Sequence, residues 1–331
     1  MSTRPIPIPQ PSMSQLEASC ANLTRHRQSP LLVLFYPAKS RIEEWDLTDV
    51  YDTLRSSGAT PENKIPKLDV FLDSYGGNPV AAYRLAQVIR DFSEEVCFLV
   101  PEHAYSAATL MCFAGNEIRL GHFAGLSPID ITLVSEGGRA PRKEVELATV
   151  DSFMEFAQDA RRMIEEELVK IGCDGVTNVD SDLLVAMVKE VGAMQVGKYY
   201  RERMLTGHYA TTLLDSYMFA GLTDGVQRRK DVVENFLFGA PAHNIHLDYH
   251  ICSEWRLQVE EMPTMESDLA RDVLARLNEL ASAKTICQAL SHKTRFPYFG
   301  WYAQASQAEP QSTAQAAPPF AQQVAAGGQA P

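Results

Sequence analysis

The sequence predicts an α/β protein whose core is a mostly parallel sheet, followed by long helical additions. In the front half, short apolar runs alternate with apolar residues at helical spacing, a rhythm typical of strands and helices that follow one another along a parallel sheet. From about Arg142 the rhythm changes to long, Glu-rich helical stretches. The 331 residues, 45% hydrophobic and 22% charged, have the composition of an ordinary globular protein and can bury a sizeable core.

Four short segments of the front half are predicted strands. The first and third are continuous apolar runs and the second is apolar except for Asp69, as expected of strands that are buried on both faces of a sheet. The four segments are Leu31 to Phe35, Leu68 to Leu72, Val96 to Val100 and Glu117 to Leu120.

Helices are predicted between these strands. Val80 to Phe92 carries its apolar residues on one helical face, and Asn78 followed by Pro79 is a suitable N-cap and first-turn pair for it. Val50 to Ser56 belongs to a helix or its end, and Ala107 to Ala114 is a short apolar helix. We therefore expect a sheet covered by helices on both faces.

The second half is predicted to be mainly helical. Long helices are expected over Lys143 to Lys170 and Asp182 to Met204. After Gly207 we expect further short helices, a second αβ stretch around residues 212–257 and a helix from Met265 to Ala283. Additions of this kind build oligomer contacts or cover a cleft.

The predicted domain organisation is one folded unit between two loose ends. Residues 1–15 contain four prolines and read as a flexible leader, residues 16–300 as one domain, and residues 301–331 as a disordered Ala/Gln/Pro-rich tail. The N-terminus has no apolar signal region, and no apolar run is long enough for a membrane span. We therefore expect a cytoplasmic protein with no membrane partner.

Charge and cysteine content limit the partners. The net charge of -12 would repel a phosphate backbone, so nucleic acid is not expected as a partner. The six cysteines are scattered without a CxxC pair, which favours a reducing compartment over a disulfide framework or a zinc knuckle.

A histidine-rich segment near the end of the domain has the spacing HxxHxxxH. Its possible ligands are His243, His246, Asp248 and His250. A metal site would need a helix to present these side chains together, whereas Pro241 just upstream and the local composition favour an irregular or extended segment. We therefore expect no bound metal and no cofactor.

Two strand-to-helix turns carry the candidate chemistry. Gly76 and Gly77 follow the second predicted strand, and paired glycines there allow backbone N–H groups to approach an oxyanion. Ser106 follows the third strand, where its hydroxyl would be exposed and the next amide, that of Ala107, could donate to the same oxyanion. A plain tight turn and a plain N-cap serine are the structural alternatives.

In their order, these motifs resemble the Clp/crotonase superfamily, and within it the serine dehydrogenase proteinase family, relatives of signal-peptide peptidase A and the Clp proteolytic subunits. Ser74 to Gly77 stands where the family has TPGG or SPGG, and Ser106 to Thr109 where it has a SAGT-like turn. Leu126 to Ile131 is similar to LGPIDPQ, and His243 to His246, with the later Met262-Pro263, to the family's closing segment. The resemblance spans roughly residues 30–265.

This resemblance implies an ATP-independent, homo-oligomeric serine peptidase that cleaves a peptide or protein substrate. In that interpretation Ser106 attacks the carbonyl carbon, and backbone amides of Gly76, Gly77 and Ala107 form the oxyanion hole. The sequence contains no GxxxxGK[ST] motif, which agrees with an enzyme that does not use ATP itself.

The general base is left open among three residues. In Clp proteolytic subunits a histidine follows the serine, but the corresponding positions around Asp130 contain none. Lys143, at the head of a predicted helix, lies near the position of the lysine in Ser/Lys relatives, and a desolvated lysine can act as a base. His243 matches the family's recurring histidine, and Asp130 could orient either one.

Two alternative functions stay open. Tyr75 in place of proline, Ala108 in place of glycine and the missing histidine fit a catalytically inactive scaffold or binding protein. The same turns could hold the oxyanion of a thioester, as in acyl-CoA-processing crotonase-like enzymes, although those do not need a serine at position 106.

Overall fold

The computed structural model describes residues 13–38, 40–129, 132–134, 144–146, 193–240, 245–289 and 297–303. Within these ranges the protein is an α/β structure around a six-stranded sheet with the order β10-β1-β2-β3-β5-β9. All neighbours in this sheet pair in parallel except β10, which is antiparallel to β1. The strands are β1 (Leu31–Phe35), β2 (Ile65–Asp73), β3 (Ser93–Val100), β5 (Glu117–Leu120), β9 (Val259–Glu261) and β10 (Tyr298–Tyr302).

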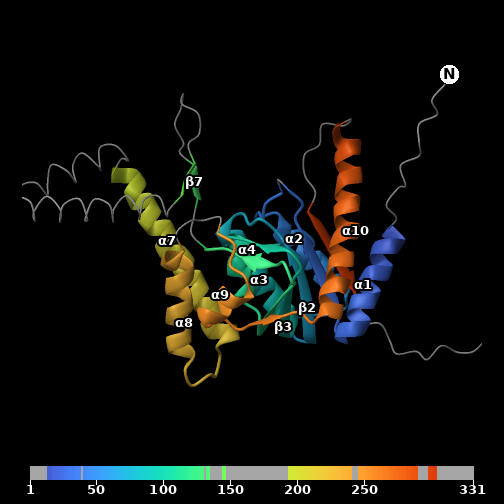
Figure 1. Cartoon of the computed structure of the whole chain (residues 1–331), viewed down its shortest axis with the longest axis horizontal. Helices are drawn as coiled ribbons and strands as arrows, with labels where there is room; N and C mark the ends of the chain where they lie inside the picture. The colour runs from blue at the N-terminus through green and yellow to red at the C-terminus, as the bar shows by residue number, and fades with distance from the viewer. Residues whose placement is uncertain are drawn as a thin grey trace, which may run out of the picture.

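Helices cover both faces of this sheet. Because side chains alternate along a strand, Leu32 and Val70 lie in one core cluster while Val33 and Phe71 lie in the other. The first cluster includes residues of α2 (Asp46–Ser56), α3 (Pro79–Phe92) and α4 (Ala107–Cys112), and the second includes residues of α1 (Met13–Arg27) and α10 (Thr264–Ala289). Figure 1 shows α1 and α10 side by side on one flank of the molecule.

A second group of helices extends the first core on the opposite flank (Figure 1). It packs through aromatic rings: Phe236 meets Phe113 at 5.3 Å between ring centroids, and Tyr209 stacks on Tyr83 at 4.1 Å. The elements of this group are α7 (Ala193–Leu213), the π-helical η1 (Leu214–Met218), α8 (Gly225–Glu234), the π-helical η2 (Asn235–Gly239) and α9 (Tyr249–Glu254).

Two short strand pairs complete the described structure. β4 (His103–Ala104) is parallel to β6 (Gly125–Leu126), and this pair lies beyond the end of the main sheet. β7 (Thr132–Val134) is antiparallel to β8 (Glu144–Glu146), and β7 stands away from the sheet in Figure 1.

The front half agrees with the sequence prediction. The four predicted strands correspond to β1, β2, β3 and β5, and the helix expected from Val80 is α3. Its N-cap is Asn78, whose side-chain oxygen accepts hydrogen bonds from the amides of Val80 (2.9 Å) and Ala81 (3.2 Å). The mostly parallel sheet with helices on both faces is therefore confirmed.

The predicted domain ends need correction. Helix α1 begins at Met13, inside the predicted leader, because Leu16, Cys20 and Leu23 supply a buried face that packs against α10. Strand β10 continues to Tyr302, beyond the predicted boundary at 300, because it pairs with β1 over its whole length.

Two predictions for the second half are also wrong in part. The helix expected from Lys143 does not begin there, since Glu144–Glu146 is a strand paired with β7, and the rest of that range lies outside the described residues. The helix expected to end at Met204 continues to Leu213, and Gly207 lies inside it, with open space beside it except for one Leu237 side-chain atom. In the described parts of the chain, no helix has the length and apolar character needed to cross a bilayer.

Candidate functional site

The two turns singled out in the sequence are joined directly at the carboxyl end of the sheet. The amide of Ser74, just after β2, donates a 2.8 Å hydrogen bond to the carbonyl of His103, and the amide of Tyr105 donates one of 3.0 Å to the carbonyl of Ser74. The paired-glycine turn and the serine turn are therefore neighbouring pieces of one structure, although about thirty residues separate them in the sequence.

Gly76 makes the closest approach between the turns. Its φ is +94°, in the region that favours glycine, and a Cβ at this position would lie 2.6 Å from the carbonyl oxygen of Tyr105 and 3.2 Å from the amide nitrogen of Ala107. Gly76 and Ala107 are thus in contact, and a side chain at position 76 would push the turns apart. The Gly76 amide donates a 3.0 Å hydrogen bond to the Ser74 hydroxyl, so this predicted oxyanion-hole amide is already occupied within the turn.

Gly77 is held by the backbone of Ile42 on its other side. The amide of Ile42 donates to the carbonyl of Gly76 (3.0 Å), and the amide of Asn78 donates to the carbonyl of Ile42 (2.8 Å). These bonds fix the turn but leave the Gly77 amide without a hydrogen-bond partner among the residues that the structure describes. This amide is therefore available to a ligand.

Ser106 occupies the corner between β4 and α4 in a backbone conformation that is rare for a residue with a side chain, with φ 53° and ψ -117°. Such conformations cost free energy and are typical of functional turns, including the corner that exposes a nucleophilic serine. The residue is partly exposed, and its hydroxyl has no bond to the helix that it caps. The next amide, that of Ala107, is also unpartnered within the described part of the chain.

A buried hydroxyl network holds the serine turn from behind. The Ser127 hydroxyl accepts a 2.7 Å hydrogen bond from the amide of Ser106, and the Ser127 amide donates to Thr109 Oγ1 (3.1 Å). The Thr109 hydroxyl lies 2.6 Å from the carbonyl oxygen of Ala104 and 2.9 Å from that of Ser127. These bonds connect both ends of the turn to the segment after β6.

Four rings form a continuous row beside the two turns. Tyr75 stacks on His103 (centroids 4.6 Å apart), His103 meets Tyr105 edge to face (5.1 Å), and Tyr105 meets His246 in the same manner (6.3 Å). The Tyr105 hydroxyl also lies 2.9 Å from Nδ1 of His246. Burial raises the pKa of Tyr75 and of Tyr105, so both phenols are neutral at neutral pH.

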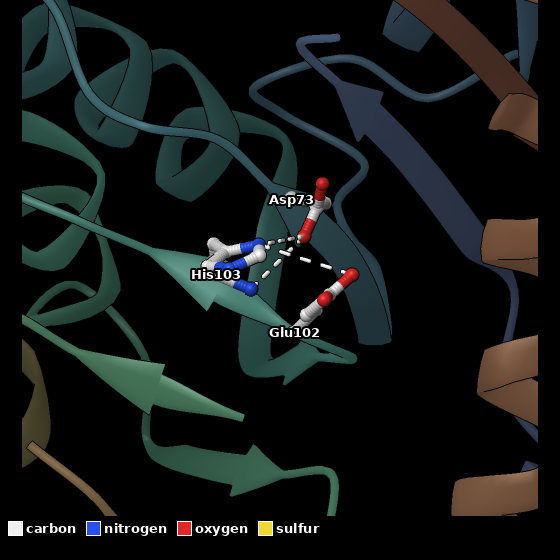
Figure 2. A group of neighbouring side chains, drawn as sticks. All are labelled: Asp73, Glu102 and His103. Carbon is white, nitrogen blue, oxygen red and sulfur yellow. Dashed lines mark hydrogen bonds and ion pairs between the residues drawn. The ribbon is translucent and has the colours of Figure 1, made fainter. Parts of the chain in front are cut away.

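His103 lies between two carboxylates, as Figure 2 shows. Its Nδ1 is 3.7 Å from Oδ1 of Asp73 and 3.9 Å from Oε2 of Glu102. The Asp73 carboxylate raises the pKa of His103, and burial acts in the opposite direction. Within the described ranges, this is the one group of three residues whose ligand atoms lie close enough together to hold a metal ion.

The structure does not describe the three residues that the sequence offers as the base or its orienting group. Asp130, Lys143 and His243 all lie outside the described residues, so their distances to Ser106 are not part of the site geometry. The described part of the histidine-rich segment is extended only around Leu247, which pairs with Leu126 through two 2.9 Å backbone hydrogen bonds, whereas His250 lies in helix α9. This pairing brings the His246 imidazole over Gly125, where an added Cβ would overlap the ring.

Two residues of this site, Ser127 and His103, received no role from the sequence, and His246 was considered there only as a possible metal ligand. Ser127 belongs to the Leu126 to Ile131 motif. Its hydrogen bond to the Ser106 amide links residues far apart in the sequence, and no sequence pattern indicates such a bond. The signal for His103 was its place directly after a buried strand, three residues before Ser106.

The fold and the two joined turns define an α/β protein with a candidate oxyanion site at the carboxyl end of a parallel sheet. No family model matches the chain. The chain is similar to the uncharacterized protein MJ0137 of Methanocaldococcus jannaschii, with 26% identity over 188 residues, 57% of this chain and 62% of that protein. It is also similar to the uncharacterized protein MJ1495 of the same organism, with 27% identity over 105 residues, 32% of this chain and 34% of that protein. The matched region thus spans less than two thirds of either relative.

Proposed function

We propose that the protein is a serine peptidase of the Clp/crotonase type, with Ser106 as nucleophile. The observation that carries the proposal is the junction of the two turns: Gly76 packs against Ala107, while the amides of Gly77 and Ala107 have no partner among the described residues. Two unpartnered amides beside a strained, partly exposed serine are what stabilisation of a tetrahedral intermediate needs.

The proposed reaction follows from these groups. The Ser106 hydroxyl adds to the carbonyl carbon of the scissile peptide bond and transfers its proton to a base, and the resulting oxyanion accepts hydrogen bonds from the amides of Gly77 and Ala107. Collapse of the intermediate breaks the C–N bond, and the protonated base returns the proton to the leaving amine. Water then hydrolyses the acyl-enzyme in the same manner.

The general base that takes the Ser106 proton is a further part of this proposal. Lys143 and His243 stay the candidates, with Asp130 as a group that could orient either one. His246 joins them, because its segment pairs with the residues next to Ser127 and its ring contacts Tyr105. A histidine base would make the rate of acylation rise near neutral pH, whereas a lysine base would make it rise at higher pH unless its pKa is lowered by burial.

Labelling with a fluorophosphonate probe tests the nucleophile. The wild-type chain should gain one label on Ser106, found by peptide mapping, and Ser106→Ala should lose it. Ser57→Ala is the matched control, since Ser57 lies at the remote end of α2, and this variant should label like the wild type. A wild-type protein that takes no label would overturn the peptidase proposal and favour the scaffold.

Two further measurements separate the remaining functions. Hydrolysis of an unstructured protein such as casein, lost in Ser106→Ala, supports a peptidase. Binding of an acyl-CoA in a calorimeter, with no peptide hydrolysis, would instead favour the crotonase-like alternative.

The base is identified by the labelling rates of Lys143→Ala, His243→Ala and His246→Ala. Rates equal to that of the wild type in all three variants would remove all three candidates.

The proposal includes a cytoplasmic homo-oligomer. Helices α7 and α8 and their neighbours expose large apolar side chains on the flank away from α1 and α10, and exposed apolar groups of this kind suit a subunit contact. The exposed apolar side chains are those of Met204, Leu222, Val226 and Phe238. The mass of the particle in solution, measured by light scattering, tests this part: a monomer at micromolar concentration would contradict it.

A further inference from the structure

The negative charges of two buried aspartates on strand β2 are balanced in different ways. Asp69, which is 0% exposed, receives two hydrogen bonds from the Arg27 guanidinium, at 2.9 and 3.1 Å. Asp73, which is 5% exposed, has no arginine or lysine within ion-pair distance in the described part of the chain. Because a buried carboxylate is costly without a positive charge beside it, the cation beside Asp73 is either the protonated His103 imidazole at 3.7 Å or a bound metal ion.

The side chains around Asp73 converge at distances longer than a charged hydrogen bond. Its Oδ1 accepts a 2.9 Å hydrogen bond from the backbone amide of His103, which fixes the carboxylate. The imidazole of His103 is held by stacking on Tyr75, yet its Nδ1 stays 3.7 Å from Asp73 and 3.9 Å from Glu102. A charged N–H···O bond would be about 2.7–2.9 Å long, so these distances leave a gap between the three ligand atoms.

The size of that gap fits a metal ion. Zn–N and Zn–O bonds are about 2.0–2.2 Å long, so two ligand atoms in a tetrahedral shell lie about 3.4 Å apart. The separations of 3.7 and 3.9 Å approach this value, and all three ligand atoms lie within 4.8 Å of one another. Glu102 is exposed, so the site is open to solvent on one side and its carboxylate can close the remaining distance.

We infer that Asp73, Glu102 and His103 form a site for a divalent first-row metal ion of the Zn²⁺ kind, with a fourth position left to water. One imidazole and two carboxylates suit such an ion. Bound there, the ion joins the end of β2 to the start of β4, three residues before Gly76 on one side and three before Ser106 on the other. It would therefore hold the paired-glycine turn against the serine turn. The sequence contained no ligand spacing that predicts this site.

The test is binding of Zn²⁺ and Co²⁺ to the full chain after dialysis against EDTA. We expect one equivalent of Zn²⁺ in a calorimetric titration and, with Co²⁺, the visible absorption of a low-symmetry site. Zn²⁺ at about 100 times its dissociation constant should also raise the melting temperature by about 5 °C or more, because the ion binds only the folded state. No binding, or several weak equivalents without a Co²⁺ spectrum, would overturn the inference.

Variants locate the ion. His103→Ala and Asp73→Asn should each weaken Zn²⁺ binding at least about tenfold. If Asp73→Asn does not fold, Glu102→Gln at an exposed position makes the same test. The matched control is His122→Ala: His122 also faces a carboxylate, Glu261 at 3.2 Å, but has no second one within ion-pair distance in the described structure, and this variant should bind as wild type does.

Two other variants complete the test. His250→Ala removes a member of the HxxHxxxH spacing, and loss of binding there but not in His103→Ala would overturn the inference. Ser106→Ala should bind Zn²⁺ as the wild type does, because the site does not depend on the proposed nucleophile. A failed metal titration would likewise leave the labelling of Ser106 untouched.

Discussion

The backbone amide of Ser106 donates a 2.7 Å hydrogen bond to the hydroxyl of Ser127, a residue that is 1% exposed and belongs to the segment after β6. This bond holds the turn in a conformation with positive φ that the chain would otherwise leave. Ser127→Ala should therefore lower the free energy of unfolding by about 1–3 kcal/mol, the cost of an unsatisfied amide, and slow fluorophosphonate labelling of Ser106 about tenfold or more.

Urea denaturation and labelling rates measure these two effects. Ser57→Ala is the control, because the Ser57 hydroxyl also accepts a hydrogen bond from a backbone amide, that of Ala59 at 3.2 Å, but at a turn remote from the site. It should leave the labelling rate unchanged. Labelling of Ser127→Ala at the wild-type rate would mean that the turn keeps its shape without this bond.

Replacement of Gly76 tests how tightly the two turns are pressed together. In Gly76→Ala the new Cβ would lie 2.6 Å from the backbone oxygen of Tyr105, at a φ of +94°, so the turns must separate. We expect a loss of about 3 kcal/mol or more in the free energy of unfolding, together with loss of labelling at Ser106.

The companion variant is Gly58→Ala. Gly58 has a similar φ of +84° but no atom within 4 Å of an added Cβ. It should therefore lose only about 1–2 kcal/mol, the cost of the left-handed conformation alone. Equal losses in the two variants would contradict the close approach of the turns.

The elements that the sequence predicted well are those specified locally. Strand β1 is buried throughout, and β2 and β3 are buried from Leu68 and Val96 to their ends, so these parts appear as mainly apolar runs. Helix α3 carries its own start signal in Asn78 and Pro79. The meeting of the glycine and serine turns also followed, because parallel strands bring their carboxyl ends to the same edge of the sheet.

The elements that were missed depend on distant partners. Strand β9 has only three residues and gains its backbone bonds from β5, and Glu144–Glu146 is extended because it pairs with β7. The tyrosine- and tryptophan-rich β10 did carry a strand signal, but it was hidden beside the Ala/Gln/Pro-rich tail. The Ser106–Ser127 bond and the convergence of Asp73, Glu102 and His103 are tertiary, so no spacing in the sequence indicates them.

The described cysteines should be unreactive in the folded protein. Cys20, Cys97, Cys112 and Cys252 are all buried free thiols. Burial raises the pKa of Cys20 to about 12 and raises the pKa of the other three as well. Because only the thiolate reacts, iodoacetamide at pH 8 should modify Cys20 roughly a thousandfold more slowly than an ordinary cysteine.

Peptide mapping by mass spectrometry after timed alkylation measures each thiol separately. The same four cysteines should react rapidly once urea unfolds the chain, which provides the reference rate. Fast modification of any of them under native conditions would show that its part of the core opens easily.

The Arg27 and Asp69 pair should be the most sensitive charged contact in the core. Arg27, on α1, binds both oxygens of Asp69 on β2 and also reaches Glu266 on α10 at 3.2 Å, so one guanidinium joins three elements. Arg27→Met leaves Asp69 as a buried, unpaired carboxylate, whereas Glu266 keeps Arg119 at 3.4 Å. We expect a loss of about 3–5 kcal/mol in the free energy of unfolding at pH 7.

The double variant and the pH dependence separate charge from packing. Arg27→Met with Asp69→Asn removes the uncompensated charge and should regain at least half of that loss, as measured by urea denaturation. Burial raises the pKa of Asp69 in the folded protein, so the folded state binds this proton more tightly than the unfolded state does. Arg27 lowers this pKa, so its removal raises the pKa further. Arg27→Met should therefore gain more stability than the wild type as the pH falls from 7 toward 5, which shrinks the difference between them. A difference that stays constant over this range would mean that the lost contact is one of packing rather than of charge.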